Sequence, residues 1–114
     1  MALIQSANVT VMVSDLDAAI NFYVDTLGFT LVNRFGEHWA DIEGPGIAIG
    51  LHPTDKPIAA GTNLQIGLRV QNLAKSVAML EEKGVEFQNQ DEAQVRLASF
   101  QDPDGNTLYL VEPS

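Results

Sequence analysis

The chain contains the same pattern twice, and this repeat constrains its fold more than any other feature. Residues 8–20 alternate aliphatic and polar side chains, then continue into a polar helix cap and an amphipathic segment. Residues 65–77, which lie 57 positions further along a chain of 114 residues, have the same order. A module of this size cannot easily bury one face of its own sheet, so two copies are expected to pack together. We therefore predict a single domain made of two modules, residues 1–57 and 58–114.

Each module has the pattern of a strand, a helix and three further strands. In the first module the helix is expected to begin at Ser14 or Asp15, which are good N-caps, and to end at Gly28. Asn72 and Gly84 hold the same places in the second module. The predicted fold class is therefore α+β, with the order βαβββ twice. Alternation and flanking turns predict strands at residues 7–13, 29–35, 38–43, 46–52, 64–70, 85–88, 95–101 and 107–111, with a linker at 55–62.

Composition excludes several functional classes. The absence of cysteine removes disulfides, thiolate nucleophiles and thiolate metal sites. A net charge of −9 argues against nucleic acid as a partner, because binding phosphates requires a basic face. No apolar run is long enough to span a membrane, and no basic segment leads into a signal core, so we expect a cytoplasmic protein without a membrane partner. The acidity fits either simple solubility or a cationic ligand.

The two faces of the predicted sheet differ in character. One face is aliphatic and is expected to lie beneath the helices. Its residues include Val9, Val11, Ile49, Leu64, Leu108 and Leu110. The other face mixes small, polar and large side chains, which fits a concave ligand-binding cleft or a solvent-facing side of the sheet. We predict the cleft. Its candidate ligand-binding residues are Asn8, Thr10, Met12, His38, Trp39, Gly50, His52, Gln65, Arg69, Arg96 and Tyr109.

Several of these residues have more than one interpretation. Arg69 could hold a ligand carboxylate or phosphate, or form a salt bridge in so acidic a protein. Trp39 could stack on a planar ligand, or belong to the core or a dimer contact. Arg96 and His38 occupy comparable places on predicted third strands and could face each other across the opening. Tyr109 could donate a hydrogen bond from its hydroxyl into the cleft.

Three stretches of the chain are characteristic: Asn8-Val-Thr-Val-Met-Val-Ser-Asp-Leu, Ala19-Ile-Asn-Phe-Tyr-Val-Asp-Thr-Leu-Gly-Phe and Asp102-Pro-Asp-Gly-Asn-Thr-Leu-Tyr-Leu. Together they resemble the vicinal oxygen chelate superfamily. This group joins glyoxalase I, bleomycin-resistance proteins, fosfomycin-resistance transferases and extradiol dioxygenases. The resemblance implies paired βαβββ modules that curve into a half-barrel around a cleft, and it covers nearly the whole chain. The carboxylates of the last stretch, Asp102 and Asp104, are typical of a tight turn rather than of a catalytic pair.

The resemblance also implies where the metal ligands of the family would fall, namely Asn8, Gly50, Gln65 and Tyr109. None of these is a usual ligand, because a divalent metal prefers imidazole or carboxylate. His52, two residues beyond Gly50, is the one candidate ligand. It could equally be a hydrogen-bonding residue of the cleft wall or an exposed strand end. We expect no metal or other cofactor, with a divalent metal as the alternative.

Two functions from different classes remain open. The first is metal-independent binding of a small aromatic or cationic molecule, and this is the function we expect. The second is an enzyme, a glyoxalase-like lyase or a dioxygenase, in which a divalent metal recruited through His52 acts as a Lewis acid. A metal-free enzyme that uses His52, Tyr109 or Arg69 as acid–base groups is a third possibility. We also expect a homodimer, because open sheet edges need covering, and the cleft could form within one chain or between two.

Overall fold

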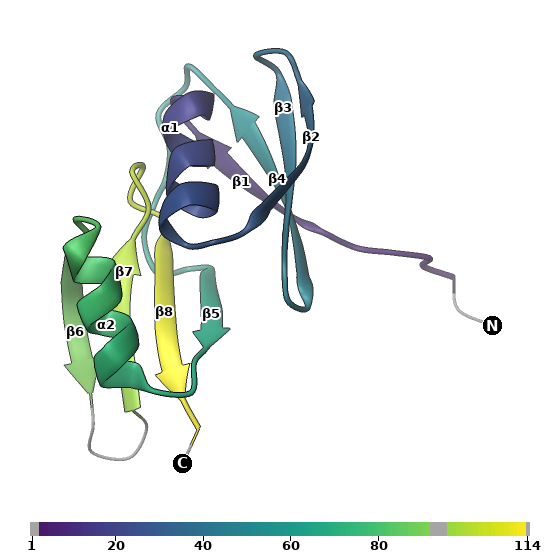
Figure 1. The fold of residues 1–114 in the computed structure, drawn as a ribbon. Helices are drawn as coiled ribbons and strands as arrows, with labels where there is room; N and C mark the ends of the chain where they lie inside the picture. Colours follow the sequence, from purple (N-terminus) through teal and green to yellow (C-terminus); the bar gives the residue numbers. More distant parts are fainter. Residues whose placement is uncertain (1–2, 92–95, 114) are drawn as a thin grey trace. The chain divides into compact units, whose positions relative to one another are not determined.

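The computed structural model describes residues 3–91 and 96–113. The chain divides into two compact units, called unit 1 (Met1–Ile58) and unit 2 (Ala59–Ser114). Within the described residues, each unit holds a four-stranded sheet with a helix against one face (Figure 1). The elements of both units follow the order strand, helix, strand, strand, strand. The predicted α+β class with two βαβββ modules is therefore confirmed.

Unit 1 has the sheet order β1-β4-β3-β2. Strand β1 runs parallel to β4, and the other neighbouring pairs are antiparallel. A bulge between Leu31 and Asn33 shifts the register of the edge strand β2 against β3. The strands are β1 (Val9–Val13), β2 (Thr30–Phe35), β3 (Trp39–Gly44) and β4 (Ile47–Pro53).

The helical segment of unit 1 changes its winding midway. It starts as α1 (Leu16–Ile20), capped by the Asp15 carboxylate, which accepts a hydrogen bond from the Ala18 N–H at 3.1 Å. It continues as a π-helix, η1 (Asn21–Thr26), a winding that is rare in proteins. The segment ends before Gly28, whose φ of 88° is the left-handed conformation that stops helices. The predicted cap and stop are confirmed, whereas the pattern predicted no change of winding.

Unit 2 repeats this topology, with the sheet order β5-β8-β7-β6 and the parallel pair β5 and β8. Asn72 caps its helix and accepts a hydrogen bond from the Lys75 N–H at 3.0 Å. A bulge again interrupts the edge strand, here between Phe87 and Asn89. The elements are β5 (Gln65–Arg69), α2 (Leu73–Glu82), β6 (Phe87–Asp91), β7 (Arg96–Gln101) and β8 (Thr107–Glu112).

The core of each unit lies between its helix and the aliphatic face of its sheet. Two residues expected on that face are open to solvent: Val9, at the start of the edge strand β1, is 40% exposed, and Leu64, which precedes β5, is 77% exposed. No helix among the described residues is long and apolar enough to cross a membrane. The buried apolar residues are Val11, Val13, Leu16, Ala19, Ile20, Tyr23, Phe29, Ala40, Ile42, Ile49 and Leu51 in unit 1, and Leu73, Val77, Val85, Ala98, Phe100, Leu108 and Leu110 in unit 2.

Most predicted strand limits differ from the observed ones by one to three residues, two of these differences have a clear local cause, and one predicted start lies outside the described residues. Strand β3 begins at Trp39, so His38 belongs to the turn between β2 and β3, where its N–H donates to the Phe35 carbonyl. Strand β6 begins at Phe87, because the Val85 N–H donates to a carbonyl of α2 and so completes the helix end. The predicted start at Val95 is the one outside the described residues.

Candidate functional site

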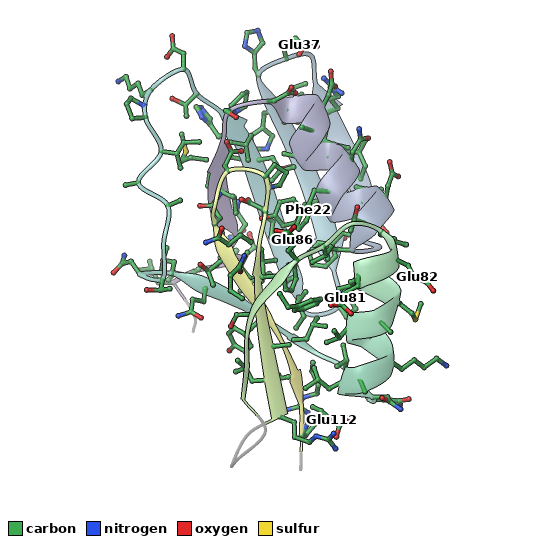
Figure 2. All side chains as sticks on the ribbon, turned by 90° about the vertical axis from the view of Figure 1, so that its left-hand side faces the viewer. Phe22, Glu37, Glu81, Glu82, Glu86 and Glu112 are labelled. Atoms are coloured by element: carbon green, nitrogen blue, oxygen red, sulfur yellow. The ribbon has the colours of Figure 1, made fainter. Side chains whose placement is uncertain are left out.

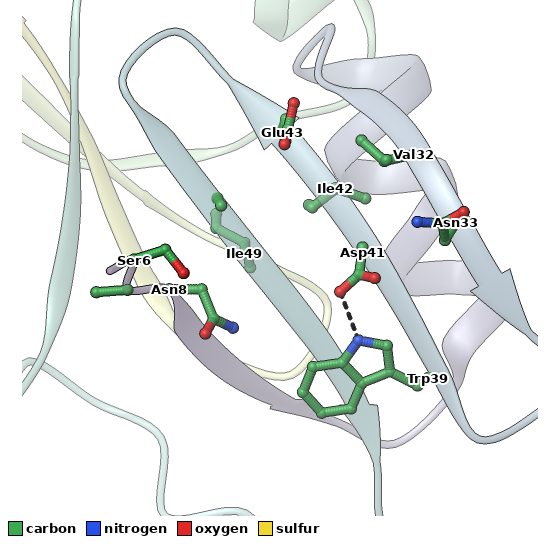
Figure 3. Close-up of a pocket in the computed structure, with 11 residues that line it drawn as sticks. Ser6, Asn8, Val32, Asn33, Trp39, Asp41, Ile42, Glu43 and Ile49 are labelled. Atoms are coloured by element: carbon green, nitrogen blue, oxygen red, sulfur yellow. Dashed lines mark hydrogen bonds between the residues drawn. The ribbon is translucent and has the colours of Figure 1, made fainter. Parts of the chain in front are cut away.

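Unit 1 carries a hollow of about 480 Å³ on the sheet face that its helix leaves open (Figure 3). Alternation along β3 creates this face. Ala40 and Ile42 are fully buried on the side where α1 packs, so Trp39, Asp41 and Glu43 point the other way. A hollow of this volume is large enough for a small organic molecule. Its lining consists of Ser6, Ala7, Asn8, Val32, Asn33, Trp39, Asp41, Ile42, Glu43, Ala48 and Ile49.

Trp39 forms one wall of the hollow and is held from several sides. Its indole N–H donates to Oδ1 of Asp41 at 2.6 Å. Its ring crosses Gly50 on β4 so closely that a Cβ there would overlap the six-membered ring of the indole. The His52 imidazole meets the indole edge-on, with ring centroids 5.7 Å apart. The missing side chain at Gly50 is therefore what allows the indole to rest on the sheet.

The hollow is acidic, because Asp41 and Glu43 are its only charged lining residues. Among the described residues, neither carboxylate forms an ion pair. Arg34 is the one arginine of unit 1, and its guanidinium binds Asp17 at 2.7 Å and Glu37 at 3.2 Å. The hydrogen bond to Asp17 raises the pKa of Arg34 above its usual value. Figure 2 shows Glu37 at the tip of the turn between β2 and β3.

Two amides and the Ser6 side chain complete the polar lining. Asn33 comes from β2 and Asn8 precedes β1, so the two lie on different sides of the strands β3 and β4 (Figure 3). The bulge in β2 sets Asn33 opposite Asp41 in the sheet register, and bulges commonly redirect a side chain in this way. Each amide offers both donors and an acceptor, so the hollow can bond neutral polar groups as well as cations.

The matching face of unit 2 is organised around a different aromatic residue. Tyr109 on β8 lies across Gly67 on β5, and its phenol fills the space that a Cβ would take. Gln65 and Arg69 share that face of β5 and are exposed. The Gln65 amide donates to the Thr62 carbonyl at 3.2 Å. Arg69 forms no ion pair within the part of unit 2 that the structure describes, so the salt bridge considered for it is not found there.

The structure brings most of the predicted unit 1 residues onto one surface. Thr10 and Met12 on β1 are the register partners of Gly50 and His52 on β4. Trp39 crosses Gly50 and meets His52, so the five residues form one continuous surface beside the hollow. Of these five residues, Trp39 also lines the hollow. Asn8, a further predicted residue just before β1, lines it as well.

Two predicted residues lie elsewhere in their units. His38 is exposed in its turn. Arg96, at the start of β7, binds Oε2 of Glu112 at 3.0 Å, and the other oxygen of Glu112 accepts the Leu73 N–H at 2.8 Å. Figure 2 shows Glu112 beside the start of α2. Arg96 thus takes part in joining β7, β8 and α2. That Arg96 and His38 face each other stays a prediction.

Sequence reasoning missed four polar residues of the hollow, namely Ser6, Asn33, Asp41 and Glu43. Ser6 lies before the first predicted strand, where alternation assigns no face. Asp41 and Glu43 had a signal, since they share the phase of Trp39 in a stretch whose alternate members, Ala40 and Ile42, are apolar. Asn33 had none, because the bulge in β2 breaks the alternation on which such a prediction depends.

The residues present do not fit the divalent metal that the resemblance offers as an alternative. Among the side chains that the structure describes, no three from His, Asp or Glu gather where they could hold an ion. At the implied positions, Gly50 has no side chain, while Asn8 and Gln65 offer only neutral amides. Tyr109 offers a phenol, a poor ligand beside imidazole or carboxylate. No step through a metal can be derived from these groups.

Comparisons with known proteins agree with this fold. A family model described as the Glyoxalase/Bleomycin resistance protein/Dioxygenase superfamily matches residues 5–110. An uncharacterized protein from Mycolicibacterium smegmatis (strain ATCC 700084 / mc(2)155) is 31% identical over 108 residues, which cover 92% of this chain and 90% of the relative.

Two solved structures extend the comparison. TnmS3, an antibiotic binding protein from Streptomyces sp. CB03234, is 32% identical with a TM-score of 0.74, covering 97% of this chain and 99% of that one. The fosfomycin resistance protein FosX from Listeria monocytogenes has a TM-score of 0.82 at 16% identity, covering 99% of this chain and 96% of its own. The likeness to FosX concerns the fold alone.

Proposed function

This chain belongs to the Glyoxalase/Bleomycin resistance protein/Dioxygenase superfamily, and we propose that it is a cytoplasmic protein that binds a small aromatic or cationic molecule without a metal. The observation that carries the proposal is the hollow of unit 1, which has an aromatic wall and a polar lining but no histidine. The similarity to TnmS3, an antibiotic binding protein, supports binding rather than catalysis.

The groups on the open sheet faces can each contribute to recognition. Trp39 offers a ring for stacking, and Asn8 and Asn33 offer hydrogen bonds. In unit 2, Tyr109 offers a hydroxyl, and Arg69 can hold a carboxylate or phosphate of the ligand. We propose that each of the two open faces can contribute contacts to a ligand.

We also propose that the protein forms a homodimer. The edge strand β2 exposes three large apolar side chains, Leu31 at 39%, Val32 at 46% and Phe35 at 56%. An edge with free backbone groups and apolar side chains favours pairing with another chain. Sedimentation at micromolar concentration is expected to show a species of twice the chain mass. Detection of a 12.3 kDa species alone would contradict the dimer.

A thermal-shift screen of a compound library, followed by calorimetry on the compounds that stabilise the protein, tests binding directly. The metal content of protein purified without chelator tests the other half of the proposal. We expect at least one stabilising compound and far less than one equivalent of metal per chain. One equivalent of zinc, nickel, iron or manganese, lost together with an activity in His52→Ala, would favour the metal-dependent enzyme instead.

A further inference from the structure

We infer that the hollow of unit 1 selects ligands that are both flat and cationic, with the ring stacked on Trp39 and the positive group held at Asp41 and Glu43. The inference rests on the proposed function and narrows it to one ligand class at one place. It depends on two features of the hollow: how Trp39 is fixed, and which of its charged groups form no ion pair.

Trp39 is a preformed stacking surface. One side of the indole rests on Gly50, and the Asp41 carboxylate accepts the indole N–H at 2.6 Å. A fixed ring loses little conformational freedom when a flat ligand packs against it. The hydrogen bond also brings a negative charge close to the indole, and a cation near the ring is attracted by both the carboxylate and the π-electrons.

The charges of the hollow are unbalanced. Asp41 and Glu43 are two residues apart on β3, so they lie on the same face, roughly 7 Å apart along the strand. Only one oxygen of Asp41 receives the indole N–H, and neither carboxylate forms an ion pair among the described residues. The guanidinium of Arg34, the one arginine of unit 1, is held by Asp17 and Glu37. A cationic ligand therefore meets two unpaired carboxylates, whereas an anionic ligand is repelled.

Two probes with the same ring system separate charge from shape. N-methylacridinium is a permanent cation, and acridine is neutral at mildly alkaline pH. Calorimetry on the full chain gives the two dissociation constants. Trp39 is the one tryptophan of the sequence, so its fluorescence reports whether binding occurs at this wall. We expect the cation to bind about tenfold tighter and to quench Trp39, with the difference shrinking as salt is added.

Variants that each remove one negative charge test where the cationic group of the ligand binds. Asp41→Asn and Glu43→Gln are each expected to weaken N-methylacridinium about three- to fivefold while leaving acridine unchanged. Asp55→Asn and Glu81→Gln are matched controls, because they remove the same charge from exposed residues outside the hollow. These controls are expected to leave both probes unchanged. Circular dichroism checks that each variant is folded.

The outcomes separate this inference from the proposed function. Equal affinity for the two probes would overturn the charge selectivity, as would equal losses in Glu43→Gln and Glu81→Gln. A screened neutral or anionic compound that quenches Trp39, with no binding of N-methylacridinium, would overturn the inference and leave small-molecule binding in place. If neither the screen nor either probe gives any binding, both the inference and the proposed function are wrong.

Discussion

Unit 1 and unit 2 share a scaffold but differ on the sheet face that the helix leaves open. In both, the first strand pairs in parallel with the last, and the edge strand carries a bulge. Asp15 and Asn72, which are 57 positions apart, cap the two helices by accepting a hydrogen bond from the backbone N–H three residues on. The features common to the two units are those that build the core.

The open faces are arranged differently. In unit 1 an aromatic residue from β3, Trp39, covers a glycine of β4, whereas in unit 2 an aromatic residue from β8, Tyr109, covers a glycine of β5. The strand registers show that β3 of unit 1 is equivalent to β7 of unit 2. At the positions equivalent to Asp41 and Glu43 of β3, β7 has Ser99 and Gln101. The repeat therefore identifies the scaffold of each unit, but ligand contacts cannot be transferred from one copy to the other.

The largest expected effects test whether the two cores are equivalent. Leu51 and Leu110 occupy matching places on β4 and β8 and are 0% and 2% exposed. Leu51→Ala and Leu110→Ala should each lower the free energy of unfolding by about 2–5 kcal/mol, because each leaves a cavity. Urea unfolding followed by circular dichroism measures both losses. Losses that differ by more than about 2 kcal/mol would show that the shared scaffold does not imply equally packed cores.

The glycines beneath the aromatic rings give the next largest effects. Gly50→Ala and Gly67→Ala should each cost about 1–3 kcal/mol, because the added methyl group overlaps a ring that must move. Only Gly50→Ala should change the tryptophan emission spectrum, since Trp39 is the one tryptophan. The double variant Trp39→Leu with Gly50→Ala should recover part of the loss. An unchanged emission spectrum in Gly50→Ala would contradict the placement of the indole on β4.

The turn before the last strand distinguishes the units as well. In unit 2 the buried Asp102 carboxylate accepts hydrogen bonds from the Asp104 and Asn106 N–H groups at 2.9 and 2.8 Å. Asp102→Ala leaves these donors without that partner and should cost about 1–3 kcal/mol in urea unfolding. A ligand bound at Trp39 should keep its affinity in the folded variant. A loss of affinity without loss of fold would give Asp102 a role beyond the turn.

The features that the sequence predicted well are local. A cap such as Asp15, a helix stop such as Gly28 and the Asp102 turn depend on a few neighbouring residues, and the structure has all three. Alternation was enough to assign Leu108 and Leu110 to the buried face and Tyr109 to the other, which the structure confirms. These elements could be predicted because their causes lie within one turn or one strand.

The features that escaped prediction depend on register or on a local irregularity. Trp39 rests on Gly50 because β3 pairs with β4 in one particular register, and a single strand carries no information about its partner. Nothing in the sequence pattern signals the bulge that sets Asn33 opposite Asp41. The change to π-helix at Asn21 follows from no capping or breaking residue. The candidate site was therefore half predicted: its aromatic wall was expected, and its acidic lining was not.

The smallest expected effects compare the two helix caps. Asp15→Ala and Asn72→Ala each remove the acceptor for one backbone N–H and should cost about 1 kcal/mol. Asp15→Asn keeps the acceptor while removing a charge near the helix N-terminus, so it should cost only a few tenths of a kcal/mol. Added salt should reduce the difference in the free energy of unfolding between the unmodified protein and Asp15→Asn. It should leave the cost of Asn72→Ala unchanged, because Asn72 carries no charge. Urea unfolding at low and high salt measures this contrast. A cost of Asn72→Ala that falls with salt would mean that its side chain does more than accept the Lys75 N–H.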